Sequence, residues 1–327
     1  MKAAVLQKYG KKLEILELAQ PQVGSGEVLV RLLYAGVNPL DNMISQGKLR
    51  LVLPYHTPLI AGNELVGIVW QVGEGVSGLK AGDRVFGRVD FDQIGTFCEF
   101  AALRADTLAL VPDGFSDEQA ACLPLAALTA MQAFSELGVV AGGRLFISGA
   151  SGGFGLVAVA LAKAMGLWVC ASGNERAKQT LLSLGADCFI DYKKQDYLGI
   201  EKVDYVIDTI AQAKRQLALL KPGGALVSLK DMPNLAFARK MGFGFAKRAL
   251  FALTGCGLDM AAKRRGVRYG FVFVRADGDE LLKAARILEK FKFKPKIDEI
   301  FSLNEANLAL QKVANGATNG KVLIKIS

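Results

Sequence analysis

The chain has 327 residues, of which 51% are hydrophobic and 36 are glycine, and its formal net charge at pH 7 is +9. This length predicts two domains, and the composition excludes a disordered or fibrous protein. No apolar run reaches the length of a membrane span and the N-terminus does not resemble a signal peptide, so we expect a soluble, cytoplasmic protein.

The first third of the chain, residues 1–122, carries short alternating apolar stretches separated by turn signals such as VGSGE and VPDG. This pattern predicts a β-rich domain. From residue 123 to residue 269, helix-length apolar stretches alternate with short strands, which is typical of a doubly wound parallel sheet of the α/β class. One expected helix in this part covers residues 212–224. Residues 270–327 are expected to return to the first domain.

A glycine-rich turn, Gly149-Ala-Ser-Gly-Gly-Phe-Gly155, follows the strand candidate 144–148 and precedes an apolar helix. Glycines allow a tight turn and let the backbone N–H groups of the helix N-terminus approach a pyrophosphate. An ordinary strand-to-helix turn is the alternative. The strand before the turn, the helix after it and the repeated βαβ pattern favour a dinucleotide site.

The end of the next strand bears on which dinucleotide binds. Ser172 and Asn174 end this strand and Arg176 follows, and small polar and cationic groups suit the 2′-phosphate of NADPH. Glu175 is the exception, because an acidic residue directed inward at this place would favour NAD. We therefore expect NADPH, with NAD as the alternative.

A zinc site built from cysteine and histidine lacks ligands in this sequence. There is one histidine, His56, and the five cysteines are scattered with no C-x2-C pair. The odd number and apolar surroundings of the cysteines also argue against a disulfide framework. We expect no bound metal.

Several motifs from residue 38 to residue 322 together resemble the medium-chain dehydrogenase/reductase superfamily, and within it the zinc-free quinone oxidoreductase and 2-alkenal (enone) reductase branch. They are Asn38-Pro39-x-Asp41, Gly62-Asn63-Glu64-x-x-Gly67, Gly82-Asp83-Arg84-Val85, Leu128-Thr129-Ala130, Leu184-Gly185-Ala186-Asp187, Leu220-Lys-Pro-Gly-Gly224 and Gly320-Lys321-Val322. The resemblance implies a GroES-like catalytic domain, residues 1–122 and 270–327, with an NADPH-binding Rossmann domain, residues 123–269, inserted into it.

The resemblance also implies the absence of zinc. The Val37-Asn38 region stands at the first ligand position of the zinc enzymes, Gly62-Asn63-Glu64 replaces their Gly-His-Glu motif, and no cysteine cluster follows Gly95. The reaction is then expected to proceed without a Lewis acid.

Site residues are carried over from the family position by position. Asn38 and Asp41 would flank the substrate and the nicotinamide. The cofactor would be held by Thr129 at the nicotinamide, by Ser151, Gly152, Gly153 and Phe154 at the pyrophosphate, by Ser172, Arg176 and Tyr192 at the 2′-phosphate and adenosine, by the backbone of Phe271 to Val274 at the carboxamide, and by Lys321 at the phosphates. Three alternatives stay open: Asn38 caps a turn, Thr129 lies on a helix surface, or Tyr192 merely ends a strand.

The proton donor is less evident. Related enzymes often carry a tyrosine in a Gly-x-Tyr segment, where this chain has Gly47-Lys48-Leu49. Tyr55 is the nearby candidate, whereas His56 is more typical of a loop residue. Backbone or amide groups can stabilise the enolate or hydroquinone anion and solvent can protonate it, so a resident acid is not required.

The resemblance predicts an NADPH-dependent, zinc-independent oxidoreductase that transfers hydride to quinones or to the C=C bond of α,β-unsaturated carbonyl compounds. The alternatives are an enoyl-thioester reductase for CoA-bound or carrier-bound substrates and a non-catalytic NADPH-binding protein. The expected partners are a small electrophilic acceptor and a second copy of the chain in a homodimer, and no nucleic acid.

Positive charge is concentrated between Asp231 and Gly270, where eight basic and two acidic residues leave +6 in forty residues. This local excess does not indicate a nucleic-acid surface spread over the fold. Phe237, Met241 and Phe245 are four apart, which predicts one helix over residues 234–253 with an apolar stripe. We expect this helix to cap the substrate cleft, with a membrane-surface contact as the less favoured alternative.

Overall fold

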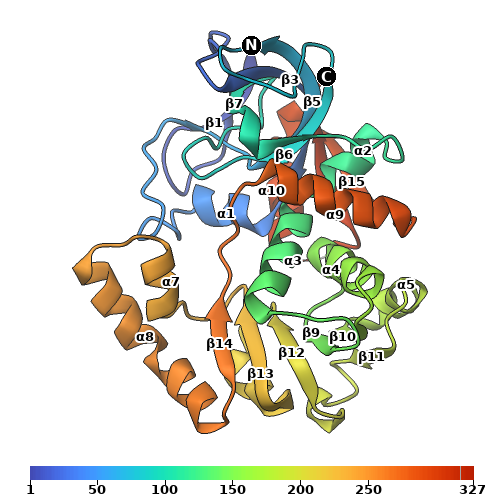
Figure 1. Cartoon of the computed structure of the whole chain (residues 1–327). Helices are drawn as coiled ribbons and strands as arrows, with labels where there is room; N and C mark the ends of the chain where they lie inside the picture. The colour runs from blue at the N-terminus through green and yellow to red at the C-terminus, as the bar shows by residue number, and fades with distance from the viewer. Residues whose placement is uncertain (317) are drawn as a thin grey trace. The chain divides into compact units, whose positions relative to one another are not determined.

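The computed structural model describes residues 1–316 and 318–327 (Figure 1). The chain divides into two compact units, one formed by residues 1–128 and 275–327 and the other by residues 129–274. The second unit therefore begins after residue 128 and ends at residue 274, where the sequence suggested 123 and 269.

The first unit is built on β-sheets, as its alternating apolar pattern predicts. A seven-stranded sheet has the order β15-β16-β3-β5-β6-β8, with β7 paired to β3, and a three-stranded sheet has the order β2-β1-β4. The strands are β1 (Lys2–Leu6), β2 (Glu14–Glu17), β3 (Glu27–Val37), β4 (Leu59–Ile60), β5 (Glu64–Val72), β6 (Arg84–Arg88), β7 (Phe100–Arg104), β8 (Leu108–Leu110), β15 (Ile297–Ser302) and β16 (Lys321–Lys325). Val28, Val30 and Leu32 of β3 share a core with Leu65 and Val69 of β5, because alternate residues of a strand point to the same face.

Helices complete the first unit. They are α1 (Pro39–Ser45), α2 (Asp117–Ala121), α9 (Gly278–Lys290) and α10 (Ala306–Ala314), with 3₁₀ turns at Ala105–Thr107 and Leu303–Glu305. Helix α3 (Pro124–Leu137) begins in this unit and continues into the second.

The second unit contains a six-stranded sheet in the order β11-β10-β9-β12-β13-β14, and each neighbouring pair is parallel. Its strands are β9 (Arg144–Ile147), β10 (Trp168–Gly173), β11 (Cys188–Asp191), β12 (Val203–Asp208), β13 (Leu220–Ser228) and β14 (Arg268–Phe271). Its other elements are α4 (Gly153–Ala164), α5 (Lys178–Ser183), α6 (Ala213–Gln216), α7 (Leu235–Lys240) and α8 (Phe245–Arg264), with 3₁₀ turns at Glu175–Ala177, Tyr197–Gly199 and Leu217–Leu219. The doubly wound parallel sheet predicted from the sequence is confirmed.

The helix expected over residues 212–224 is wrong from Leu220 onward, because α6 and the 3₁₀ turn Leu217–Leu219 end before it. Helix α6 ends at Gln216, and Leu220 already belongs to β13. Pro222 has no backbone N–H to donate and Gly223 has a φ of +80°, so neither residue continues a helix.

The single helix expected over residues 234–253 is also wrong. Helix α7 ends at Lys240, Gly242 has a φ of +69°, and Gly244 is the N-cap of α8. The two helices pack on β14 and on each other (Figure 1). Phe237 is 4% exposed and Phe245 is 88% exposed, so the predicted stripe does not form one face. Among the described residues, no helix is long and apolar enough to cross a membrane.

Candidate active site

Asn38 occupies the N-cap position of α1, and Pro39 begins the helix because its missing N–H is not needed there. The carboxylate of Asp41 accepts a 2.7 Å hydrogen bond from the backbone N–H of Asn38. The side chain of Asn38 bonds elsewhere, since its Nδ2 donates to Oε1 of Glu64 at 2.7 Å. The capping alternative thus describes the position of Asn38 but not the bonding of its side chain.

Glu64 lies at the centre of a buried polar cluster. Lys321 Nζ donates to Asn38 Oδ1 at 2.6 Å and also pairs with Oε1 of Glu64, while Oε2 of Glu64 accepts from the backbone N–H of Leu125 at 2.7 Å. A Cβ on Gly36 would overlap the Glu64 carboxylate, so the glycine in β3 makes room for it. Each carboxylate oxygen has a donor, which is what a buried ion pair requires.

Asp41 is joined to this cluster through the backbone N–H of Asn38, and Asn63 Nδ2 also donates to its Oδ1 at 2.6 Å. Burial raises the pKa of Asp41 to about 7, and the nearby charge of Glu64 adds to the increase. Hydrogen bonds from Asn63 and from the Asn38 backbone, and the charge of Lys321, act in the opposite direction. Asp41 therefore exchanges its proton near neutral pH, the range that acid–base catalysis uses.

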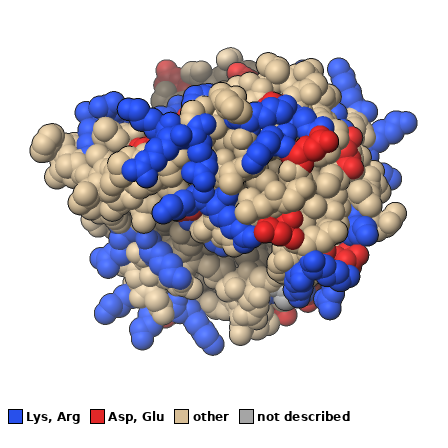
Figure 2. Space-filling model, turned by 90° about the horizontal axis from the view of Figure 1, so that it is seen from below, with Lys and Arg blue, Asp and Glu red and all other residues tan. Residues whose placement is uncertain are grey.

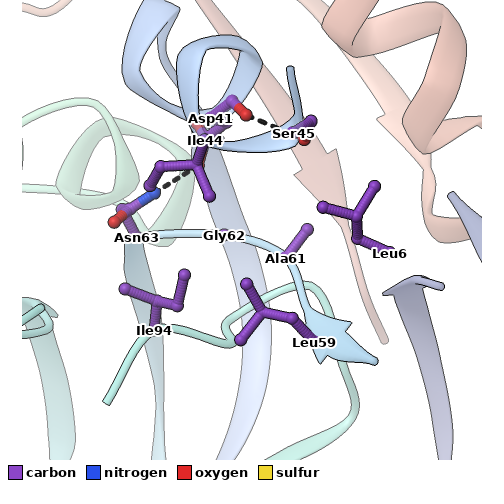
Figure 3. A pocket seen from close by; sticks show the side chains of 9 residues that line it. All are labelled: Leu6, Asp41, Ile44, Ser45, Leu59, Ala61, Gly62, Asn63 and Ile94. Atoms are coloured by element: carbon purple, nitrogen blue, oxygen red, sulfur yellow. Dashed lines mark hydrogen bonds between the residues drawn. The ribbon is translucent and has the colours of Figure 1, made fainter. Parts of the chain in front are cut away.

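A small pocket opens beside this pair (Figure 3). Its lining is mostly apolar and consists of Leu6, Asp41, Ile44, Ser45, Leu59, Ala61, Gly62, Asn63 and Ile94. Figure 3 shows the Asn63 amide turned toward Asp41 and the hydroxyl of Ser45 bonded to the backbone oxygen of Asp41. The pocket thus sets the Asp41–Asn63 pair beside apolar walls.

Tyr55, the third expected catalytic residue, bonds to neither Asn38 nor Asp41 among the described contacts. Its hydroxyl is buried and has no hydrogen-bond partner in the described part of the chain. Burial raises the pKa of Tyr55 well above its usual range, and the charge of Arg88 acts against this increase. His56 is exposed, as expected of a loop residue.

Arg88 was missed by the sequence analysis. It ends β6 and is fully buried, with Nη1 at 3.2 Å from Oδ1 of Asp90 and its guanidinium 4.1 Å from the centre of the Phe91 ring. The signal was an arginine among the apolar residues of the VFGRV strand, where a charged side chain calls for a partner.

The glycines of the turn in the second unit have two different roles, because some are needed by the turn itself and one faces open space. Gly149 has a φ of +62°, and a Cβ on Gly155 would overlap the backbone of Ala150, so both glycines serve the turn itself. A Cβ on Gly152, the N-cap of α4, would meet no atom of the described residues within 4 Å. The space before this 12-residue helix suits a pyrophosphate, which the helix dipole would favour.

The structure pairs Glu175 with lysines. Its carboxylate lies 2.9 Å from Lys194 Nζ and 3.7 Å from Lys178 Nζ. Arg176 is exposed and forms no ion pair with the described residues, and Ser172 is buried at the end of β10. Positive charge therefore predominates here, and the acidic residue that would have favoured NAD is engaged by cations. Lys194 was not among the residues expected at this site.

Comparison with known proteins decides the family. Residues 24–113 match the family described as alcohol dehydrogenase GroES-like domain, and residues 184–324 match the one described as zinc-binding dehydrogenase. Over 339 residues the chain is 31% identical to 2-methylene-furan-3-one reductase of Solanum lycopersicum, covering 99% of this chain and 79% of that protein. The chain belongs to the medium-chain dehydrogenase/reductase superfamily.

Two further members of this superfamily are similar over nearly the whole chain. NADPH-dependent alkenal/one oxidoreductase, chloroplastic, of Arabidopsis thaliana is 30% identical, covering 96% of this chain and 78% of that protein. The quinone oxidoreductase of Thermus thermophilus, described with its NADPH complex, superposes with a TM-score of 0.77 at 26% identity and full coverage of both chains. The expected fold, a Rossmann-type sheet inserted into a GroES-like domain, is thereby confirmed.

Zinc is the metal that the name of the second matching family implies. The residues present do not fit it, because no group of three or more His, Cys, Asp or Glu side chains in the described part of the chain is placed to hold a metal ion. Asn38 and Asn63 offer amides, which are poor zinc ligands, and the Asn38 oxygen already accepts from Lys321.

The other residues that the superfamily implies fall in three settings. Thr129 is partly buried in α3, and Tyr192 is exposed directly after β11. Phe271 packs its ring 5.3 Å from that of Phe237, and Val274 is buried. Lys321 directs its ammonium group to Asn38 and Glu64, so its expected phosphate contact stays a prediction.

Proposed function

We propose that this chain is an NADPH-dependent oxidoreductase that transfers hydride, without zinc, to quinones or to the C=C bond of α,β-unsaturated carbonyl compounds. The observation that carries the proposal is the buried network of Asn38, Asp41, Asn63, Glu64 and Lys321. By resemblance to the superfamily motifs, Asn38 and Asn63 of this network stand where the zinc enzymes carry ligands, which supports a reaction without zinc. Relatives named alkenal/one oxidoreductase and 2-methylene-furan-3-one reductase support the same reaction class.

NADPH fits the residues of the second unit, where it would supply the hydride when bound. Ser151, Gly152, Gly153 and Phe154 would hold the pyrophosphate, because this turn offers backbone N–H groups and open space at the start of α4. Ser172, Arg176 and Lys194 would hold the 2′-phosphate, and Tyr192 would contact the adenosine. Thr129, the Phe271–Val274 backbone and Lys321 keep their expected contacts with the nicotinamide, carboxamide and phosphates as part of the proposal.

The first unit would bind the acceptor and stabilise the charge that hydride transfer produces. Hydride addition to the β-carbon of an enone leaves negative charge on the carbonyl oxygen, and one proton completes the saturated product. Asp41 holds a proton near neutral pH at the polar side of the pocket, where it would stabilise that charge by hydrogen bonding. Asn38 and Asn63 would keep the Asp41 carboxyl in place, and solvent would supply the proton that completes the saturated product.

The test is a turnover assay that follows NADPH oxidation with a quinone, a 2-alkenal and an enoyl-CoA, each with and without a metal chelator. We expect turnover with the quinone or alkenal, preference for NADPH over NADH, and no effect of the chelator. Loss of activity with chelator and its return with zinc would overturn the zinc-free claim. Turnover restricted to the CoA ester would establish the thioester reductase, and tight NADPH binding without turnover would establish the non-catalytic protein.

Location and assembly remain predictions. The Arabidopsis relative is named chloroplastic, so the cytoplasmic location expected from the sequence needs cell fractionation. The expected homodimer is tested by light scattering of the purified chain.

A further inference from the structure

The guanidinium of Arg88 has one edge without a protein partner. Nη1 pairs with Asp90, whereas Nε and Nη2 are buried and meet no hydrogen-bond acceptor in the described part of the chain. A buried cationic group with unsatisfied donors is costly, so such a group indicates a bound species that completes it.

The same edge of arginine binds oxygen elsewhere in this chain. In Arg104, Nε and Nη2 lie 3.0 and 2.8 Å from the two carboxylate oxygens of Asp106. In Arg84, Nε lies 2.9 Å from the Asp117 carboxylate and Nη2 lies 2.8 Å from a backbone oxygen. Nε–H and Nη2–H point in parallel, and a carboxylate matches both at once. The unpaired edge of Arg88 therefore has the geometry that suits a carboxylate.

A second unpaired donor belongs to the same neighbourhood. The Tyr55 hydroxyl is buried without a partner among the described residues, and Arg88 is the nearby charge that most lowers the pKa of Tyr55. The hydroxyl of Tyr9 donates to the backbone oxygen of Tyr55 at 2.7 Å, which fixes the backbone that carries this side chain. Two donors of Arg88 and one of Tyr55 are thus buried without partners among the described residues, and the charge of Arg88 acts on Tyr55.

Arg88 is also close to the candidate active site. It is the direct partner of Glu64 in the antiparallel register of β5 and β6, so the two side chains share a face of the sheet. The next residue, Val89, donates its N–H to the backbone oxygen of Asn63 at 2.9 Å. Asn63 and Ile94 line the pocket beside Asp41, and Ile94 belongs to the loop that follows Arg88.

We propose that Arg88 and Tyr55 bind the carboxylate of an acidic acceptor, so that the preferred substrate is an α,β-unsaturated carbonyl compound carrying a carboxylate group. The substrate part of this inference rests on the proposed function. Neutral alkenals and quinones leave the three donors unpaired, whereas a carboxylate gives each an acceptor and adds a negative charge beside the guanidinium.

The kinetic test compares 4-oxo-2-pentenoate with its methyl ester as acceptors. Arg88→Met removes the charge and the donors, and we expect it to raise KM for the acid about tenfold more than KM for the ester. Tyr55→Phe should raise KM for the acid by a smaller factor. Arg104→Met, which removes an exposed arginine paired with Asp106, is the matched control and should change neither value. Equal effects of Arg88→Met on acid and ester would overturn the proposal.

A binding test is independent of turnover. Calorimetric titration with 4-oxopentanoate, a saturated keto acid, should show binding to the wild-type chain and to Arg104→Met, and loss of binding in Arg88→Met. Absence of binding to the wild type, or equal binding to Arg88→Met, would contradict the site. Binding without reduction of any acceptor would leave the site in place and overturn the proposed function.

A second variant and a second ligand complete the test. If Arg88→Met does not fold, as judged by circular dichroism, Arg88→Lys replaces it in the titration. This variant keeps the charge but lacks the parallel donors, so it should still bind 4-oxopentanoate more weakly than the wild type. Acetate is the second arm. If acetate binds at Arg88 as tightly as 4-oxopentanoate and the acid acceptor gains nothing over its ester, the site takes a free anion, and the substrate proposal is wrong.

A separate observation concerns α8, which is apolar on two opposite faces. Phe251, Gly255, Leu258 and Ala262 are buried. On the other side, Phe245, Leu253 and Met260 are 88%, 74% and 52% exposed, and their spacing of eight and seven residues aligns them on one face of a helix. This exposed stripe replaces the one expected from the sequence.

Basic side chains flank the exposed stripe. Lys247, Arg248, Lys263 and Arg264 belong to α8, and the 231–270 segment carries a net charge of +6. Lys and Arg side chains also outnumber Asp and Glu on the face drawn in Figure 2. A second copy docked on this stripe would bring two basic surfaces together, whereas an anionic lipid surface complements both the charge and the apolar side chains. We infer that α8 attaches the protein peripherally to anionic membranes.

Flotation with phosphatidylcholine vesicles, with and without phosphatidylglycerol, tests this attachment. We expect binding to the anionic vesicles only, weakened by salt and lost in the double variant Phe245→Ser/Leu253→Ser. Leu308→Ser, which alters an exposed leucine of α10, is the control and should bind normally. Failure to bind anionic vesicles would contradict the inference, as would a dimer in solution that the double variant dissociates.

Discussion

Lys321 Nζ lies 2.6 Å from Asn38 Oδ1, although 283 residues separate the two along the chain. The contact joins the final strand, β16, to the turn that begins α1. Lys321 also pairs with Glu64, so one buried ammonium group holds three segments of the first unit together.

Removal of this ammonium group should destabilise the fold. Lys321→Met leaves the Glu64 carboxylate buried without its cation, and we expect a loss of about 3–5 kcal/mol in the free energy of unfolding, measured by urea denaturation. Lys321→Met combined with Glu64→Gln should lose less than the sum of the single variants. The exposed pair of Arg104 and Asp106 is the control, and Arg104→Met should cost less than about 1 kcal/mol. A Lys321→Met variant as stable as wild type would contradict the role of the buried pair.

Asp41 should make stability depend on pH. Its folded-state pKa is raised from 3.8 to about 7, so between these values the folded chain holds a proton that the unfolded chain has released. Stability from this group is therefore complete below the unfolded pKa and is lost as pH rises toward 7, by at most about 1.4 kcal/mol per pH unit. Asp41→Asn removes this slope. Urea denaturation of both proteins across this range measures it, and identical slopes would show that the pKa is not raised.

Two glycines of the cofactor turn should behave differently. Gly155→Ala places a Cβ against the Ala150 backbone and should destabilise the second unit. Gly152→Ala meets no described atom of the chain within 4 Å, so it should leave the melting temperature unchanged while weakening NADPH binding. Thermal unfolding and fluorescence titration with NADPH separate the two effects. Normal NADPH affinity in Gly152→Ala would show that the pyrophosphate does not bind beside Gly152.

Coenzyme preference should depend on Arg176 and Lys194. Replacement of either residue by Gln should weaken NADPH binding about tenfold and leave NADH binding nearly unchanged, because only NADPH carries the 2′-phosphate. Glu175→Gln is the matched variant. Because lysines already pair with Glu175, we expect the same titration to show no loss of NADH affinity in Glu175→Gln. A marked loss would assign Glu175 to the ribose and favour NAD.

Much of the fold was readable from periodicity and glycine placement. The alternating residues of β3 and β5 and the strand–turn–helix around Gly152 depend on local sequence, so local patterns predicted them. The break between α7 and α8 was missed because apolar spacing continued across it, while Gly242 and Gly244 decided the backbone. The helix expected over residues 212–224 was too long for a similar reason, because the expectation extended it across Pro222.

The site was only partly predictable. Motifs indicated Asn38, Asp41 and Lys321, but their mutual bonds depend on contacts between strands distant in sequence. Arg88 was missed because its burial follows from the pairing of β6 with β5, and Lys194 because its contact with Glu175 bridges two separate strand ends. Long-range pairing of this kind leaves no trace in local periodicity.

The proposed reaction is hydride transfer from NADPH to an enone or a quinone. Its most direct test is a reaction with NADPH deuterated at both C4 positions and with trans-2-hexenal, followed by mass spectrometry and NMR of the product. We expect hexanal with one deuterium at the β-carbon, formed equally in the presence of chelator. Deuterium at the carbonyl carbon, or neither a deuterated product with any enone nor NADPH oxidation with any quinone despite bound NADPH, would contradict it.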